Sequence, residues 1–134
     1  MGVSGCMDTA EPKRVIIESP YAGNVKLNVA YAQACLLDSL NRGEAPIASH
    51  LLYTQVLNDL VPTERKQGID AGLAWRKVAE AAALYVDFGV SEGMNLARKL
   101  YEREGIPFEQ RTLPQNALML IKLYPNVKAP DYQW

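Results

Sequence analysis

The segment from Asp87 to Met94 holds the residue types best suited to chemistry. Asp87 and Glu92 are two carboxylates that follow a short apolar run, and Glu92 falls in the first turn of the helix expected after that run. A carboxylate pair at the end of a buried strand suits acid–base or glycosyl chemistry, in which one group ionises and the other protonates a leaving group. The alternative is structural, because a helix N-terminus favours a nearby carboxylate and an aspartate often stabilises a turn.

The segment Ser19–Asn24 is a second candidate site, because it joins an expected strand to an expected helix. Its backbone N–H groups and the helix N-terminus could hold an anion such as a phosphate. A tight turn that needs Pro20, Gly23 and Asn24 only for geometry explains the same residues, since no GxGxxG or P-loop pattern is present. His50 ends the next expected strand, where a histidine is either a hydrogen-bonded structural residue or a member of the site.

Short apolar runs alternate with helical patterns along the chain and predict the elements that position these residues. Strands are predicted at 14–18, 45–49, 83–87 and 107–111, and helices at 25–42, 51–58, 62–81 (with Thr63 as its cap), 91–104 and 116–123. This alternation implies a parallel sheet with helices on both faces, a three-layer α/β fold. Sites in such sheets lie at the carboxyl ends of the strands. The loops expected at that edge are 19–24, 49–52, 87–92 and the segment after Thr112.

The composition is that of one globular domain. The chain has 134 residues, of which 49% are hydrophobic and 22% charged, so we expect one domain over 13–124 between tails at 1–12 and 125–134. Fourteen basic against fifteen acidic residues argue against nucleic-acid binding through bulk charge. One histidine and two cysteines offer no metal-ligand spacing, so neither a metal nor a cofactor is expected. No apolar run has the length of a signal peptide or a membrane span, so we expect a cytoplasmic protein without a membrane partner.

Several segments occur in a characteristic order. They are Ser19-Pro20-Tyr21, Ala45–Tyr53, Gly68–Trp75, Asp87–Met94 and Gly105-Ile106-Pro107. Over about residues 13–112 this order resembles the nucleoside 2-deoxyribosyltransferase-like family, in particular its small phage and bacterial branch. The resemblance implies a flavodoxin-like or Rossmann-like fold, a nucleoside or nucleotide ligand, and a pocket shared between subunits of a homodimer or larger homo-oligomer. In that family a glutamate attacks the anomeric carbon and an aspartate protonates the departing base.

The expected site combines these motifs with the candidate residues. Glu92 and Asp87 are the expected catalytic carboxylates, with Asp70 in reserve. The expected ligand-binding residues are Ser19, Pro20, Tyr21, Gly23, Asn24, His50, Gly89, Ser91, Gly93 and Met94. The resemblance places the nucleophilic glutamate eight residues before Gly105, where this chain has Ala97, and a methyl group cannot attack carbon. Glu92 lies five residues earlier, about 500° around a helix and so about 140° from the face of Ala97.

Three functions remain open from the sequence. The first is an enzyme that cleaves or transfers an N-glycosidic bond with Glu92 or Asp87. The second is a catalytically inactive protein that binds and sequesters a nucleotide, for instance in phage counter-defence within a bacterial host cytoplasm. The third is an oligomeric interaction protein without a small ligand. Self-association is also favoured by the apolar side chains of Leu51, Leu52, Tyr53 and Trp75, which exceed the needs of one small sheet.

Overall fold

The structure, a computed structural model, describes residues 11–122 of the chain. The strands are β1 (Arg14–Glu18), β2 (Ala45–Ile47), β3 (Ala81–Tyr85) and β4 (Phe108–Arg111). The helices are α1 (Val25–Asn41), α2 (Pro62–Ala74), α3 (Glu92–Glu104) and α4 (Gln115–Lys122), and three short 3-10 turns are η1 (Ser49–Leu51), η2 (Tyr53–Gln55) and η3 (Trp75–Lys77). The four strands form one sheet of order β2-β1-β3-β4, and every strand pairing in it is parallel.

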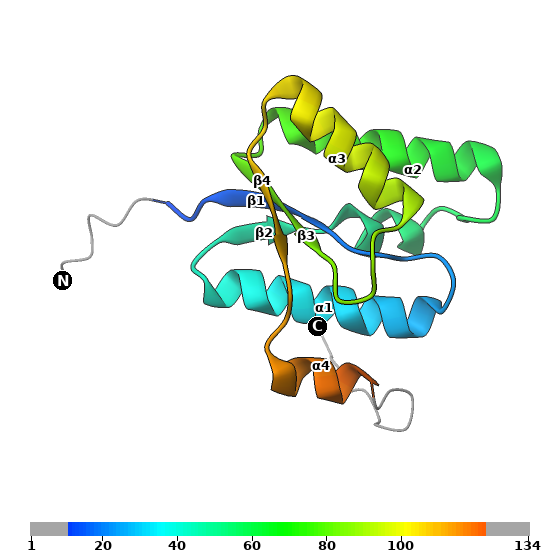
Figure 1. Cartoon of the computed structure of the whole chain (residues 1–134). Helices are drawn as coiled ribbons and strands as arrows, with labels where there is room; N and C mark the ends of the chain where they lie inside the picture. The colour runs from blue at the N-terminus through cyan, green and yellow to red at the C-terminus, as the bar shows by residue number, and fades with distance from the viewer. Residues whose placement is uncertain (1–10, 123–134) are drawn as a thin grey trace.

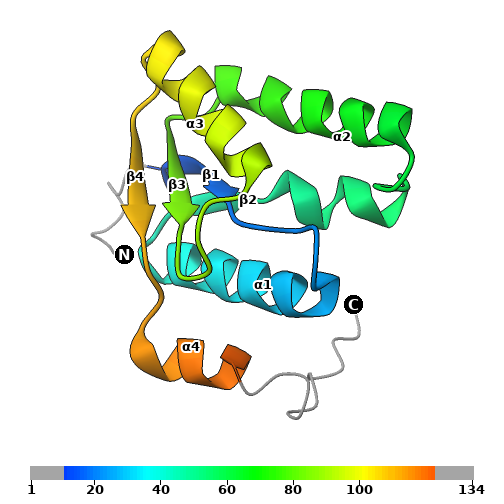
Figure 2. The ribbon, with the colours of Figure 1, turned by 45° about the vertical axis from the view of Figure 1, so that its right-hand side comes forward.

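Helices cover both faces of this sheet, which confirms the three-layer α/β fold. Helices α1 and α4 lie on one face, and α2 and α3 lie on the other (Figures 1 and 2). The chain moves from β1 outward to β2 and then back past β1 to β3. Right-handed crossovers in opposite directions put α1 and α2 on opposite faces. The order is that of a flavodoxin-like doubly wound sheet, in which ligands bind outside the carboxyl ends of the strands near the reversal.

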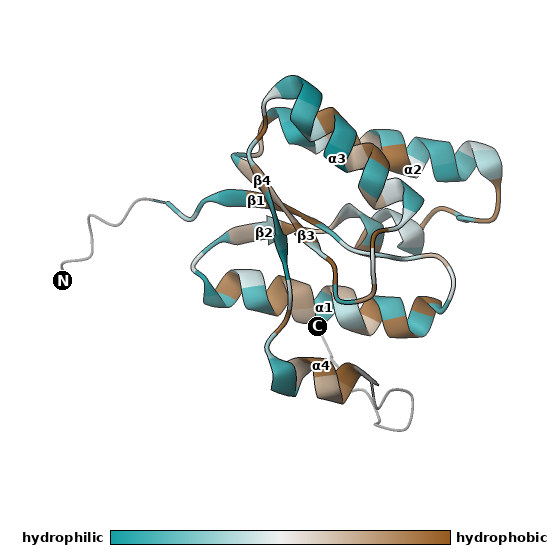
Figure 3. Cartoon of the chain, viewed as in Figure 1, coloured by the Kyte–Doolittle hydropathy of each residue, from teal (hydrophilic) through white to brown (hydrophobic). Residues whose placement is uncertain are grey.

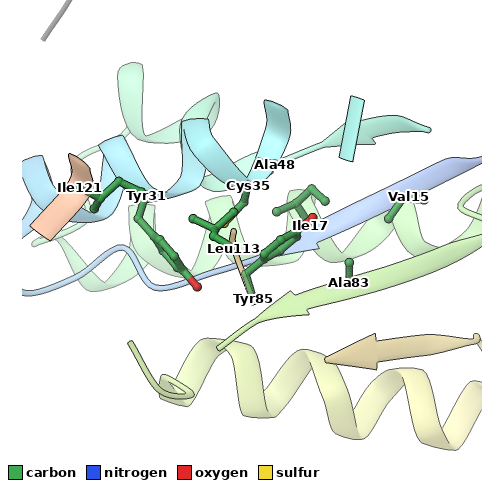
Figure 4. Close-up of a cluster of buried hydrophobic side chains, with 9 residues drawn as sticks. All are labelled: Val15, Ile17, Tyr31, Cys35, Ala48, Ala83, Tyr85, Leu113 and Ile121. Carbon is green, nitrogen blue, oxygen red and sulfur yellow. The ribbon is translucent and has the colours of Figure 1, made fainter. Parts of the chain in front are cut away.

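Alternating side chains of the central strands build one apolar cluster on each face. Val15 and Ile17 of β1 pack toward α1 and α4 in the cluster drawn in Figure 4. Ile16 belongs to the opposite cluster, with Met94 and Tyr101 of α3. Because side chains alternate along a strand, Glu18 continues the Ile16 side and faces the α2–α3 layer.

The edge strand β4 differs from the buried strands in polarity. It is mostly teal, that is hydrophilic, in Figure 3, because Glu109, Gln110 and Arg111 follow Phe108. By contrast, every residue of β3 is buried. Charged residues on an exposed edge protect it against pairing with another chain.

Several predicted boundaries were wrong. The third strand was predicted at 83–87 but spans Ala81–Tyr85, because Ala81 pairs with Val15 of β1 and the preceding helix, predicted to reach residue 81, ends at Ala74. Alanine favours a helix over a strand, so the sheet pairing, and not the residue type, decides where this strand begins. The second strand stops at Ile47, and residue 48 leads into η1.

The region between β2 and α2 is also less regular than predicted. In place of one helix at 51–58 the chain forms the two 3-10 turns η1 and η2. Thr63 does not cap α2: the helix begins at Pro62, and Val61 precedes it without a side-chain cap. Pro62 lacks an N–H, so it suits the first helical position, where that group would have no partner within the helix.

The predicted tails fall mostly outside the described residues. Residues 11 and 12 have no regular secondary structure, while the rest of the N-terminal tail and all of the predicted tail at 125–134 lie outside the described part. Within residues 11–122, no helix combines the length and the apolar character needed to span a membrane.

Candidate functional site

A cavity of about 360 Å³ opens at the carboxyl ends of β1 and β2, on the face covered by α2 and α3. Its wall comes from the end of β1, the turns η1 and η2, one face of α2 and the first two turns of α3. This is the sheet edge at which doubly wound folds bind ligands, and the volume is in the range of small-molecule sites.

The cavity brings together seven of the residues expected from the sequence. They are Ser19, Tyr21, His50, Ser91, Glu92, Gly93 and Met94, which come from three segments of the chain. Ala97 also lines the cavity, one turn of α3 beyond Gly93. The loops at 19–24 and 49–52 and the start of α3 therefore meet at this cavity, as predicted.

Four expected binding residues lie outside the cavity wall and shape the neighbouring turns. Gly23 and Gly89 have positive φ angles of 99° and 89°, a conformation that favours glycine. Asn24 caps α1, where its side chain accepts a hydrogen bond of 3.2 Å from the Leu27 N–H. Pro20 is buried. The structural alternative for the Ser19–Asn24 loop therefore accounts for Pro20, Gly23 and Asn24.

Asp87 is directed away from the cavity. Its Oδ2 accepts a 2.6 Å hydrogen bond from the Tyr31 hydroxyl of α1, and the Leu113 N–H donates to the same oxygen at 3.0 Å. Tyr31 and Leu113 belong to the apolar cluster on the α1–α4 face, opposite the cavity. Asp87 and Glu92 thus do not form the expected catalytic pair, because Asp87 joins α1 to the segment after β4.

The other two carboxylates considered from the sequence are exposed. Glu92 lies in the first turn of α3 at the cavity wall. Ser91 caps that helix by accepting a 3.2 Å hydrogen bond from the Met94 N–H. Asp70 lies on α2 outside the cavity wall and pairs with Lys66 at 2.6 Å. Neither carboxylate is enclosed by the protein.

Glu18, which sequence reasoning missed, is the enclosed carboxylate of the cavity. It ends β1 and lines the wall, and its Oε2 accepts a 2.5 Å hydrogen bond from the Tyr101 hydroxyl of α3. Burial raises the pKa of Glu18 from 4.5 to about 7, while the hydrogen bond from Tyr101 acts in the opposite direction. A sequence signal existed, since a glutamate directly follows three β-branched residues and directly precedes the Ser19-Pro20 loop.

Ser19 and His50 form a hydrogen-bonded pair beside Glu18. Ser19 Oγ lies 2.7 Å from His50 Nε2, and only 6% of the Ser19 surface is exposed. Burial lowers the pKa of His50 from 6.5 to about 4, so its ring is neutral at neutral pH. The pair therefore offers neutral hydrogen-bonding groups rather than a positive charge.

Helix α2 forms one wall of the cavity, although its glycines were not among the site residues expected from the sequence. Gly68 and Gly72 lie four residues apart on its cavity face. A Cβ atom at residue 72 would clash with Ser49 Oγ and would lie 2.9 Å from Ser49 Cβ, so the glycine allows α2 to approach η1. Tyr53 also lines the cavity, and its hydroxyl accepts a 2.8 Å hydrogen bond from Trp75 Nε1.

The charges around the cavity are mostly negative. The carboxylates of the wall are Glu18, Asp59, Glu64 and Glu92. Among the described residues of the wall, Arg65 is the only one with a permanent positive charge, and its Nε lies 3.8 Å from Asp59 Oδ1. Within residues 11–122, no three histidine, cysteine or acidic side chains are grouped to hold a metal ion.

The fold and the cavity define a doubly wound α/β protein with a ligand-sized site at the carboxyl edge of its sheet. The chain belongs to the family described as a domain of unknown function (DUF7768), which it matches over residues 13–111. No curated protein and no solved structure matches the chain. The family description names no ligand, so the expected relation to nucleosides stays a prediction.

Proposed function

We propose that this protein binds a nucleoside or nucleotide in the cavity between β1, α2 and α3. The observation that carries the proposal is the cavity itself, which joins flat aromatic side chains to hydrogen-bonding groups in a space of about 360 Å³. Tyr21 and Tyr53 offer ring faces on which a base can stack. Carboxylates can accept hydrogen bonds from sugar hydroxyls, as an acidic residue does for a ribose in dinucleotide-binding folds.

The charge of the wall favours a nucleoside over its phosphorylated forms. Among the described wall residues, Glu64 and Glu92 add negative charge, and Asp59 pairs with Arg65. Glu18 is only partly ionised near its pKa of about 7, and His50 is neutral. Two unit charges about 8 Å apart in water interact by about 0.5 kcal/mol, so a phosphate that meets a surplus of carboxylates loses on the order of 1 kcal/mol or more. The N-terminus of α3 lies at the wall, but Glu92 in its first turn already offsets the helix dipole.

Cleavage or transfer of an N-glycosidic bond is a second candidate function for the same site. The enclosed carboxylate of Glu18 favours it, because proton transfer needs a group with a pKa near the working pH. The methyl group of Ala97 instead favours a protein that binds without reacting, and such a protein could sequester its ligand in the cytoplasm of a bacterial host.

Self-association is part of the proposal. Leu60 and Val56 are 90% and 80% exposed, and Leu52 and Trp75 are also exposed, all within the part of the chain that contributes η2 and α2 to the cavity wall. This surface adjoins the cavity wall. A second copy of the chain that covered it would remove apolar area from water and narrow the cavity mouth. Light scattering tests this part of the proposal, and a particle with the 14.9 kDa mass of one chain at tens of micromolar would contradict it.

Calorimetric titration with unmodified nucleosides and their 5′-monophosphates tests ligand binding directly. We expect a nucleoside to bind and its monophosphate to bind about tenfold more weakly. Tyr21→Ala should weaken binding, while Leu40→Ala, an exposed position on α1 outside the cavity wall, should not. Absence of binding by every nucleoside and nucleotide would refute the proposed function.

A further inference from the structure

We infer that Glu18 is the proton-transferring catalytic residue of this cavity, acting on the N-glycosidic bond of the bound nucleoside. This inference rests on the proposed function and goes beyond it. It replaces the Asp87–Glu92 pair, which the structure does not form, with one carboxylate at the end of β1.

The position of Glu18 gives its two oxygens different surroundings. Tyr101 holds Oε2 through a hydrogen bond of 2.5 Å, and Tyr101 is itself completely buried, so this oxygen has a fixed place. Within the described part of the chain, Oε1 accepts no hydrogen bond and is not sealed inside the protein. Since Glu18 lines the cavity, Oε1 is the oxygen available to a ligand.

The surroundings of Glu18 suit a group that both gives and takes a proton near neutral pH. Burial beneath the α2–α3 layer raises its pKa to about 7. The titratable and charged groups around it are Tyr101 from α3, His50 from η1 through Ser19, and Glu92, Asp59, Glu64 and Arg65 from the rest of the wall. Tyr101 is a positioning residue, because it contacts the carboxylate rather than the cavity.

The reaction step balances with water as the second reactant. Protonated Glu18 donates its proton to the departing base while the C1′–N bond breaks, and the bond's electron pair leaves with the nitrogen. A water molecule forms the new bond to C1′ and loses a proton to the Glu18 carboxylate. The products are the free base and the free sugar, and Glu18 returns to its protonated form. Nothing is oxidised or reduced.

Base release, followed by chromatography on the full chain with the nucleoside that binds best, tests this inference. We expect Glu18→Gln to reduce kcat by about 100-fold or more. Its affinity for the nucleoside should stay within about threefold of wild type, because the glutamine amide keeps the shape of the carboxyl group and an acceptor for Tyr101. Glu102→Gln, an exposed position on α3 outside the cavity wall, is the matched control and should leave kcat unchanged.

The pH profile separates a catalytic carboxylate from a structural one. The wild-type rate should fall above about pH 7, as Glu18 loses its proton. Tyr101→Phe removes the hydrogen bond that lowers the Glu18 pKa, so the same fall should move to higher pH.

Three results would overturn the inference. Turnover that Glu18→Gln leaves intact would show that another group transfers the proton. Nucleoside binding without base release in the wild type would refute the inference while the proposed function stands. Failure of every nucleoside to bind would refute both.

Discussion

Replacing Glu18 by glutamine should remove a loss of stability that accompanies a rise in pH. In the folded state burial raises the pKa of this carboxyl group from 4.5 to about 7. Between these two values the folded chain therefore binds a proton that the unfolded chain releases. The contribution of Glu18 to the free energy of unfolding consequently falls as the pH rises through this window, and the loss is complete above about pH 7.

The size of the effect follows from the same two values. The rise of the pKa from 4.5 to about 7 corresponds to about 3 kcal/mol of free energy of unfolding. Between pH 4.5 and pH 8 the wild type should lose about this much more stability than Glu18→Gln. The glutamine carries no ionisable group and keeps an acceptor for Tyr101, so the comparison isolates the charge.

Urea unfolding at a series of pH values, followed by circular dichroism, measures this difference. Glu92→Gln removes a carboxylate from an exposed position of the same cavity wall and serves as the matched control. Parallel curves for the wild type and Glu18→Gln would refute the conclusion that the folded protein encloses a destabilised charge at residue 18.

Three further predictions test the packing and the electrostatics around the cavity. Gly72→Ala should lower the free energy of unfolding by about 1–3 kcal/mol, since its Cβ would lie 2.9 Å from Ser49 Cβ. Gly93→Ala, whose nearest contact is 4.0 Å away, should cause no loss in the same urea titration. Tyr31→Phe should cost about 1–3 kcal/mol by removing a donor from Asp87, yet leave nucleoside affinity unchanged by calorimetry; a lost affinity would place Asp87 in the site. His50 should contribute a loss of about 3 kcal/mol as the pH falls from 6.5 to 4, because the unfolded chain protonates this residue before the folded chain does, and in the wild type the gain from Glu18 opposes this loss. His50→Gln should remove that loss from the unfolding curves, and an unchanged pH dependence would contradict the enclosure of His50.

The sequence predicted the architecture well because local patterns carry it. Three β-branched residues at Val15–Ile17, a capped helix from Val25 and the Gly105 turn are each readable within about ten residues. The alternation of such strands and helices leaves a parallel sheet as the arrangement that buries both faces. Strand ends were predicted less well, because the start of β3 depends on the pairing of Ala81 with Val15.

The candidate site was predicted only in part. Backbone topology brought Ser19, His50 and Ser91 to one edge of the sheet, as expected. The face toward which each side chain at that edge points was not readable from spacing. Asp87 faces α1, where it accepts a hydrogen bond from the Tyr31 hydroxyl. Glu18 lines the cavity and accepts a hydrogen bond from the Tyr101 hydroxyl of α3.

The sequence by itself therefore determined the fold class and the set of segments that meet at the carboxyl edge of the sheet. Only the tertiary structure decided which carboxylate is enclosed there and which is held on the opposite face. The physical reason is that the side-chain directions depend on hydrogen bonds between residues far apart in the sequence. Tyr101 lies 83 residues from Glu18, and Tyr31 lies 56 residues from Asp87, so neither hydrogen bond leaves a local pattern in the chain.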